Sequence, residues 1–341
     1  WPDADVRPPF RVVSIMDQDR PDGGVASWVY SYGELRINAL RGFRGFEWIK
    51  RLDSTTKLET TQGFHQAFPL TNLPTYTEVR DTVRNGFPLV SRAEFSARAP
   101  VDTDTTGKIF RPFVETTYST DYNLDATEIR SRYTMAAQDA NGNATSNYER
   151  VAPGIVGKAS LAEGQPLPAG HFERKVTTPS FDHDTAGTNW LISRPTRVET
   201  YTKSGDHPTA ESSRATQMGY FSSSNRLQFI TQEPDAGQET FRLRTDYGYD
   251  PYGNVNSITV STPGAGVAAI ETRTSTTDFS ASTVAPLEHP IAGRFPRLVT
   301  DALAQKTSFA FDAVTGQLLR RTDEAAGLQT TWAFDAFGVQ T

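Results

Sequence analysis

The sequence predicts an all-β protein whose strands form one long antiparallel sheet of repeated hairpins. The main observation is a motif with two aromatic residues at positions i and i+2, an Asp directly after them, and a Gly three or four residues later. Asp312 and Asp335 are 23 residues apart, a period typical of repeat proteins. The three clear copies are Tyr247, Tyr249, Asp250 and Gly253; Phe309, Phe311, Asp312 and Gly316; and Trp332, Phe334, Asp335 and Gly338.

Each position of the motif has a physical reason. Aromatic residues two apart point to the same face of a strand and pack on cross-strand neighbours, at roughly 0.2–1 kcal/mol per pair. An Asp at the first position of a turn accepts a backbone N–H two residues on, and Gly suits the positive φ that follows. We therefore predict that the repeat residues are structural, with no catalytic role.

The elements along the chain are expected to be strands almost throughout. Residues 25–32 alternate, with Trp28, Tyr30 and Tyr32 on one face. Thr-rich strands and turns follow to residue 150, and Asn225 occupies the Gly position in a weaker repeat copy, where we expect a left-handed backbone. No window shows a sustained amphipathic helix. We predict a β region over 1–150, an irregular Gly/Pro/Ala-rich connection over 151–170, and the repeat region over 171–341.

The composition narrows the function classes. The net charge is -6 without a run of Lys or Arg, which argues against a nucleic-acid partner. Only 37% of residues are hydrophobic, which suits thin sheets with wet faces. The chain has no cysteine, and no apolar run reaches the roughly 18 residues of a membrane span. It begins with Trp1 and not with Met, so we expect a piece of a longer protein.

Three motifs contain residue types that bind metals, but none of them is expected to hold an ion. Asp182, His183 and Asp184, with His171 nearby, cannot all converge, because adjacent strand residues point to opposite faces. The segments 102–107 and 121–125 resemble the start of a calcium loop. Phe113 and Arg132 stand where that loop needs a bidentate Glu, so surface turns are expected and no metal is predicted.

Other chemistry is equally unsupported by the sequence. Gly264, Gly266 and Ala269 fit a dinucleotide pattern, but no helical period follows, so a hairpin loop is expected and no cofactor is predicted. No Gly-x-Ser-x-Gly elbow is present, and nothing marks a glycosidase acid pair. The aromatic ladders could stack sugars, although packing is more typical at strand spacing. We predict a protein that is not an enzyme.

The order of motifs resembles the RHS or YD-repeat family, and within it the B component of Tc insecticidal toxin complexes and related large bacterial toxins. The repeat copies carry one part of the resemblance. Other parts are the segments 28–35, 41–46, 66–74 and 189–198. Phe replaces Tyr at 311 and 334, which removes a hydroxyl. The family's C-terminal core motif with its self-cleaving aspartates is not found in these residues.

The resemblance implies a sheet that curves into a hollow RHS-type shell around a cytotoxic C-terminal polypeptide before delivery. The implied partners are the rest of the shell, the enclosed toxin and a translocation or secretion component, and the implied location is outside the bacterium. An alternative is an adhesive module that binds carbohydrate or a cell surface, as teneurin-like proteins use YD shells. A domain unrelated to the repeats and encoded after Thr341 would favour the shell.

We expect the isolated chain to associate with itself. A segment cut from a longer sheet exposes unpaired strand edges, which pair with other chains. Light scattering coupled to size-exclusion chromatography should show oligomers that grow with concentration. A monomer over the whole concentration range would indicate a self-contained domain.

Overall fold

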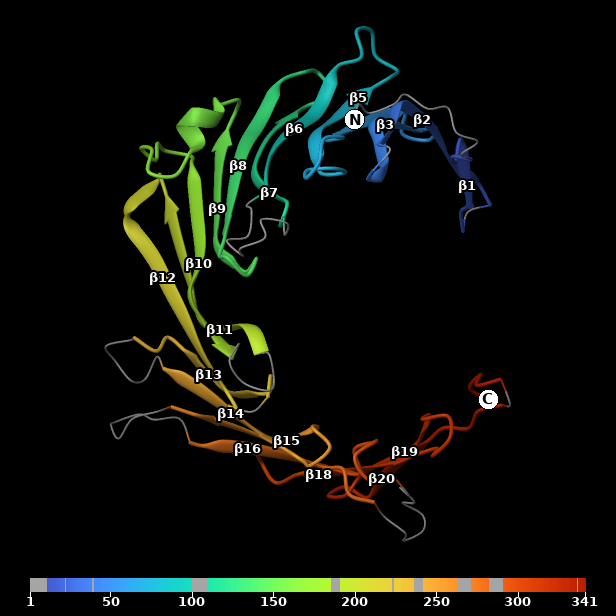
Figure 1. Cartoon of the computed structure of the whole chain (residues 1–341). Helices are drawn as coiled ribbons and strands as arrows, with labels where there is room; N and C mark the ends of the chain where they lie inside the picture. Colours follow the sequence, from blue (N-terminus) through green and yellow to red (C-terminus); the bar gives the residue numbers. More distant parts are fainter. Residues whose placement is uncertain are drawn as a thin grey trace. The chain divides into compact units, whose positions relative to one another are not determined.

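The computed structural model describes residues 11–341 except 22, 39, 100–109, 185–190, 223, 236–241, 263–270, 282–290 and 336. In this part of the chain there are twenty strands and one short 3-10 helix, η1 (Lys158–Leu161), which confirms the all-β prediction (Figure 1). No helix among the described residues has the length and hydrophobicity needed to cross a membrane. The strands are β1 (Ile15–Asp19), β2 (Val25–Asn38), β3 (Gly42–Asp53), β4 (Leu58–Phe64), β5 (Pro74–Asp81), β6 (Leu89–Arg98), β7 (Phe113–Tyr122), β8 (Glu128–Gln138), β9 (Ala144–Pro153), β10 (Phe172–Asp184), β11 (Leu191–Ser204), β12 (His207–Tyr220), β13 (Leu227–Gln232), β14 (Leu243–Tyr249), β15 (Val255–Ser261), β16 (Arg273–Asp278), β17 (Leu298–Thr300), β18 (Lys306–Phe311), β19 (Leu318–Asp323) and β20 (Leu328–Thr331).

The strands pair in the order in which they follow each other in the sequence. Each pairing described is antiparallel and joins neighbours along the chain, from β1 with β2 to β19 with β20. All the described strands belong to a single sheet. The predicted antiparallel hairpin sheet is therefore confirmed.

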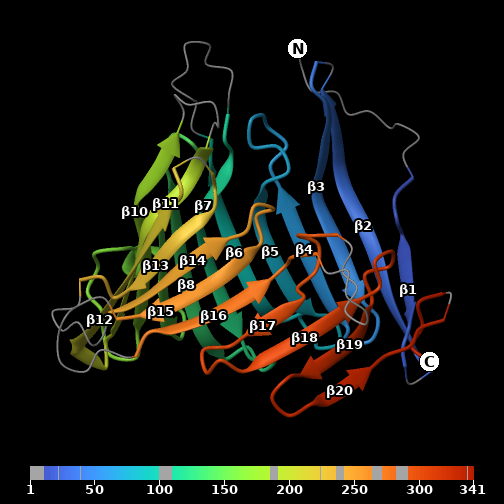
Figure 2. The same ribbon diagram turned by 90° about the horizontal axis from the view of Figure 1, so that it is seen from below.

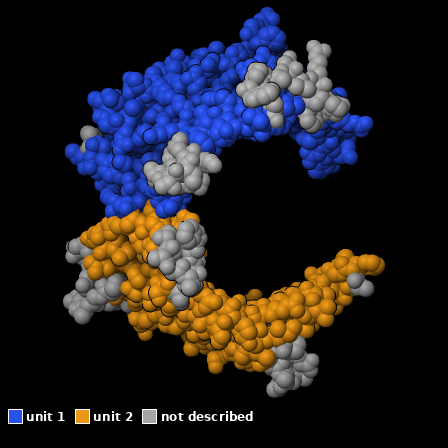
Figure 3. All heavy atoms as spheres, viewed as in Figure 1, with its two compact units in different colours: residues 1–179, 199–213 blue, residues 180–198, 214–341 orange. Residues whose placement is uncertain are grey.

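The chain divides into two compact units (Figure 3). Unit 1 contains residues 1–179 and 199–213, and unit 2 contains residues 180–198 and 214–341. This division follows spatial contacts. The boundaries expected from composition, at 150 and 170, remain a prediction.

A β-bulge follows the turn in nine of the hairpins described. In the β14–β15 hairpin, Gly248 pairs with Ser257 and Tyr249 with Val255, so Asn256 is an extra residue on the strand that leaves the turn. The same register shift occurs in the hairpins β2–β3, β4–β5, β5–β6, β6–β7, β7–β8, β8–β9, β12–β13 and β18–β19. A bulge bends its strand and increases the local twist. The twist is visible where β13 to β19 lie side by side in unit 2 (Figure 2).

Few apolar side chains are buried in this sheet. Among the described residues, the buried hydrophobic ones are Tyr133, Tyr148, Ala152, Leu161 and Ala310, whereas ten polar or charged residues are buried. Along β5, β7 and β14, most residues on both faces are half-buried. The sheet thus has water near both of its faces.

An apolar cluster of unit 1 lies under residues 154–171, here called the strap. Leu161 of the strap packs with Tyr133, Tyr148 and Ala152. The hydroxyl of Tyr118 donates to the carbonyl of Val156 at 2.9 Å. The strap therefore covers one face of β7, β8 and β9.

A buried arginine holds the strap onto the sheet. Arg150 has no exposed surface, and its guanidinium pairs with Glu173 at 2.9 Å. The same guanidinium donates to the strap carbonyls of Ser160 at 3.1 Å and Gln165 at 2.8 Å. The hydroxyl of Tyr148 also donates to Glu173, at 2.9 Å. These charge-assisted bonds offset the cost of removing the ion pair from water.

We expect Arg150→Met to lower the free energy of unfolding by about 3 kcal/mol, because the change leaves Glu173 and the strap carbonyls without their buried cation. Urea unfolding followed by tryptophan fluorescence measures this loss. Proteases should also cut within 154–171 more readily than in the wild type.

Arg132→Met is the matched control, since Arg132 pairs with Glu149 at 2.7 Å while half of its side chain is exposed. This change should cost less than about 1 kcal/mol. Equal losses in the two variants would show that Arg150 has no special role.

Candidate functional site

The repeat aspartates close hairpin turns with a shared hydrogen-bond pattern. The N–H of Asp250 donates to the carbonyl of Asn254 at 3.0 Å, and the N–H of Gly253 donates to the carbonyl of Asp250 at 3.1 Å. Oδ1 of Asp250 accepts from the N–H groups of Tyr252 and Asn254, each at 2.9 Å. The same four bonds occur at Asp139, Asp301 and Asp335.

The fourth residue of each turn has a left-handed backbone. Its φ is 98° at Gly253 and 82° at Gly338, in the region that favours glycine. Ala304 takes the same place in the Asp301 turn with φ 61°. This copy is not evident from the sequence, because Ala304 stands where the motif has a glycine. Asn225, for which a left-handed backbone was predicted, is not among the residues with positive φ, so that prediction was wrong.

The turn at Asp312 is one residue longer. The N–H of Asp312 donates to the carbonyl of Gln317 at 2.9 Å, and Gly316 has φ 77°. Oδ1 of Asp312 accepts from the N–H of Thr315 at 2.6 Å and from the N–H of Val314 at 3.0 Å. These bonds, the one from Thr315 first, hold the pKa of Asp312 below its ordinary value.

The motif aromatics stack on rings from other parts of unit 2. Phe309 and Phe311 on β18 stack with ring centroids 6.3 Å apart. Phe311 also stacks on Phe295, at 4.9 Å, from the segment before β17. Tyr249 packs edge to face against Phe221 at 5.9 Å.

The remaining motif aromatics lie in different settings. Tyr247 is on β14 opposite Ile258. Trp332 and Phe334 follow the end of β20. The N–H of Trp332 donates to the carbonyl of Leu319 at 2.9 Å, and Phe334 forms an isolated bridge with Gln340. The third copy of the motif thus has its turn but places its aromatics outside the named strands.

Two tyrosine hydroxyls of the repeat region bond to backbone carbonyls. The hydroxyl of Tyr249 donates to Leu227 at 2.9 Å, and that of Tyr220 donates to Pro195 at 3.0 Å. Phe311 and Phe334 lack this group. The motif shows where the hydroxyl is missing, but it does not identify the acceptor, which lies more than twenty residues away from Tyr249 and from Tyr220 in the chain.

Side chains also join successive turns along one rim of unit 2, here called the rim ladder. Each link is a side-chain N–H that donates to a backbone carbonyl of the next turn or loop. The links are Asn254 to Gly293 at 2.7 Å, Arg294 to Ala313 at 2.6 Å, and Gln317 to Gly338 at 3.4 Å. The rim ladder fixes the spacing of the turns.

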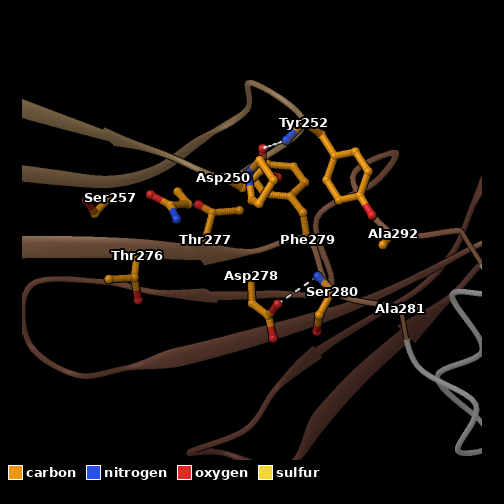
Figure 4. A pocket seen from close by; sticks show the side chains of 12 residues that line it. Asp250, Tyr252, Ser257, Thr276, Thr277, Asp278, Phe279, Ser280, Ala281 and Ala292 are labelled. Carbon is orange, nitrogen blue, oxygen red and sulfur yellow. Dashed lines mark hydrogen bonds between the residues drawn. The ribbon is translucent and has the colours of Figure 1, made fainter. Parts of the chain in front are cut away.

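A pocket of about 600 Å³ lies beside the Asp250 turn (Figure 4). Tyr252 and Phe279 contribute rings, and Asp250 and Asp278 contribute carboxylates. Both carboxylates are already engaged. Asp278 accepts from the N–H of Ser280 at 2.7 Å and pairs with Arg297. Burial raises the pKa of Asp278, but these bonds outweigh it and leave that pKa below its ordinary value.

Asp182 and His183 take part in local structural contacts. Asp182 pairs with the buried Arg194 at 2.7 Å. Nδ1 of His183 accepts from the N–H of Ser193 at 3.2 Å, and its ring stacks on Phe181. The side chain of Asp184 is outside the described residues.

His171 is buried next to Arg150 in unit 1. Burial first, and the positive charge of Arg150 second, lower the pKa of His171. A neutral imidazole is the form that binds metals, but the described residues contain no group of three or more His, Cys, Asp or Glu that could hold an ion.

The structure describes only one of the two segments that resemble the start of a calcium loop. Asp121 pairs with Arg130 at 2.6 Å, and Asp125 accepts from the N–H of Thr127 at 2.9 Å, as in a surface turn. The segment 102–107 lies outside the described residues, as do the dinucleotide-like residues Gly264, Gly266 and Ala269.

The fold matches three solved structures that contain TcdB2 and TccC3. The chain aligns with TcdB2–TccC3–Cdc42 at a TM-score of 0.54 and 11% identity, over 94% of this chain and 22% of that one. TcdB2–TccC3 without its hypervariable C-terminal region gives 0.54 and 11% over 91% and 22%, and TcdB2–TccC3 gives 0.53 and 11% over 94% and 22%. This chain thus spans less than a quarter of the solved chains. No protein-family model and no curated protein matches the sequence.

We expect Asp312→Asn to lower the melting temperature at pH 7, and the loss to shrink in acid. A carboxylate whose pKa is lowered by folding stabilises the protein above its unfolded value, near 3.8, and this contribution disappears as the pH falls through the folded pKa. Melting curves at pH 7, 4 and 3 measure the difference between variant and wild type.

Asp17→Asn is the control, because the Asp17 carboxylate has no hydrogen bond or ion pair among the described residues. Its effect should stay small at each pH. A difference for Asp312→Asn that does not change with pH would contradict a role for the ionised carboxylate.

Proposed function

We propose that the chain is a non-enzymatic wall segment of an RHS-repeat toxin shell, which encloses a cytotoxic polypeptide before delivery. The observation that carries the proposal is the fold that nearly the whole chain shares with part of the TcdB2–TccC3 structures. The repeat motif and the order of segments in the sequence resemble the same family.

The thinness of the sheet supports the proposed role as a shell wall. A shell wall faces solvent outside and a cavity inside, so neither face packs on a second layer. The half-buried side chains on both faces suit this position. Charged pairs bridge neighbouring strands, as between Arg92 and Glu78 at 2.8 Å and between Arg98 and Glu115 at 2.9 Å.

The turns also support the proposed role, because they give the hairpins of the wall a regular length. A shared hydrogen-bond pattern sets the length of the hairpins at Asp139, Asp250, Asp301 and Asp335. The rim ladder then joins successive turns of unit 2. Such a rim keeps neighbouring hairpins aligned, which a closed shell requires where its parts meet.

The proposal defines partners and location. The partners are the remaining shell, the enclosed toxin polypeptide and a translocation or secretion component, and the assembly acts outside the bacterium. The repeat aspartates serve as turn formers, since their Oδ1 atoms are used by backbone N–H groups. No reaction is assigned to this chain.

Protease protection tests the proposal in the complete gene product that contains this chain. We expect the polypeptide encoded after the repeats to resist trypsin in the intact particle and to be digested after denaturation. Electron microscopy of the same sample should show an internal void.

A matched variant makes the test specific to this wall. Gly253→Val places a branched side chain at φ 98° and against Arg226, so it should open the turn and expose the enclosed polypeptide. Val255→Ala, on the adjacent strand, should retain protection. A solid particle, or a C-terminal polypeptide digested equally fast in the native state, would refute the shell function.

A further inference from the structure

Glycines and aromatic residues alternate across four adjacent strands of unit 1. Gly33 on β2 is in register with Trp48 on β3, and Trp48 is in register with Gly63 on β4. Gly63 is in turn opposite Tyr76 on β5. Residues in register share one face of a sheet, so the two rings stand on the same face with a glycine beside each.

Each ring covers one of the glycines. A Cβ added to Gly33 would lie 2.0 Å from the indole of Trp48, and a Cβ added to Gly63 would lie 2.3 Å from the ring of Tyr76. Both glycines are therefore required for the rings to rest on the sheet. This packing stabilises the strands, and both rings remain partly exposed.

The two rings line a pocket of about 470 Å³ together with hydrogen-bonding groups. The other polar side chains in the lining are Arg36, Glu47, His65, Gln66 and Thr75. Gln66 is buried, and its amide donates to the carbonyl of Gly45 at 3.0 Å. This bond holds the Gln66 side chain in place in the lining of the pocket. The pocket has the size of a small-ligand site, and several of its lining residues carry polar side chains.

Three of the lining groups have unused hydrogen-bonding capacity. Among the described residues, no partner is present for the indole N–H of Trp48, the imidazole of His65 or the hydroxyl of Tyr76. They are placed to bond a ligand that carries both donors and acceptors.

The charge of the pocket favours a neutral ligand. Arg36 lies 3.7 Å from Glu34, so its positive charge is balanced. The hydrogen bond with Glu34, and then burial, raise the pKa of Glu47, and its carboxyl adds no positive charge to the pocket. The pocket thus lacks the excess of positive charge that would select phosphate or sulfate groups.

We propose that this pocket binds a neutral oligosaccharide, with one pyranose ring on Trp48 and another on Tyr76. The apolar C–H face of a sugar packs on an aromatic ring, and its hydroxyls bond the polar groups around it. Trp48 and Tyr76 are two strands apart, about 9.5 Å, which is on the order of the length of a disaccharide. The site goes beyond the shell function and does not depend on it.

Calorimetric titration of the 341-residue chain with cellotetraose, chitotetraose and maltotetraose tests the site. We expect at least one of them to bind saturably. Trp48→Ala and Tyr76→Ala should each weaken that binding by about tenfold or more, because each removes a stacking surface. Trp48→Phe keeps a ring over Gly33 and should weaken it only a few-fold, which covers the case in which the alanine variant does not fold.

Trp28→Ala is the matched control. Trp28 lies on β2, like Gly33, but an odd number of residues away, so it faces the other side of the sheet. The affinity of the Trp28→Ala variant for the tetrasaccharide should stay within about twofold of the wild-type affinity. The proposal is overturned if none of the three tetrasaccharides binds, or if Trp48→Ala and Trp28→Ala weaken the binding equally. Failure of this site leaves the protease-protection result for the shell unaffected.

Discussion

Backbone hydrogen bonding between consecutive strands is the constraint on which the whole structure depends. With few apolar side chains buried in the described residues, the sheet has little core to hold it together. Each strand instead satisfies its N–H and C=O groups on the strand before it and the strand after it. Turn geometry then becomes decisive, because a hairpin that closes in the wrong register shifts every side chain to the other face.

Polar chemistry takes over part of the role of the missing core. Exposed cross-strand ion pairs contribute only about 0–1 kcal/mol each, so their number matters more than any single pair. Arg150 differs, because its bonds to the strap are buried and several carbonyls depend on it. Stability is therefore spread thinly along most of the sheet and concentrated at the strap.

The sequence was sufficient for what depends on local patterns. Aromatic alternation and Asp-x-x-Gly turns predict the all-β class and the repeat, since both act within a few residues. The sequence does not reveal the Asp301 turn, because Ala304 adopts a left-handed conformation that is unusual for alanine. The prediction for Asn225 was wrong because the type of a residue does not by itself determine its φ.

Contacts distant in the sequence could not be predicted. Arg150 shows no pattern that identifies Ser160 and Gln165 as its partners. The alternation of Gly33, Trp48 and Gly63 depends on register, which is set by the turns of two different hairpins. For the same reason, the local motif at Tyr249 does not identify Leu227 as the acceptor of its hydroxyl.

The pairing of each strand with the next also has a consequence for biosynthesis. Contacts between neighbouring strands have low contact order, so each hairpin can close soon after it leaves the ribosome. Folding can then proceed from the N-terminus at the pace of translation. Such a sheet can be largely formed before any polypeptide encoded after it is made, and the later segment would meet a surface already in place.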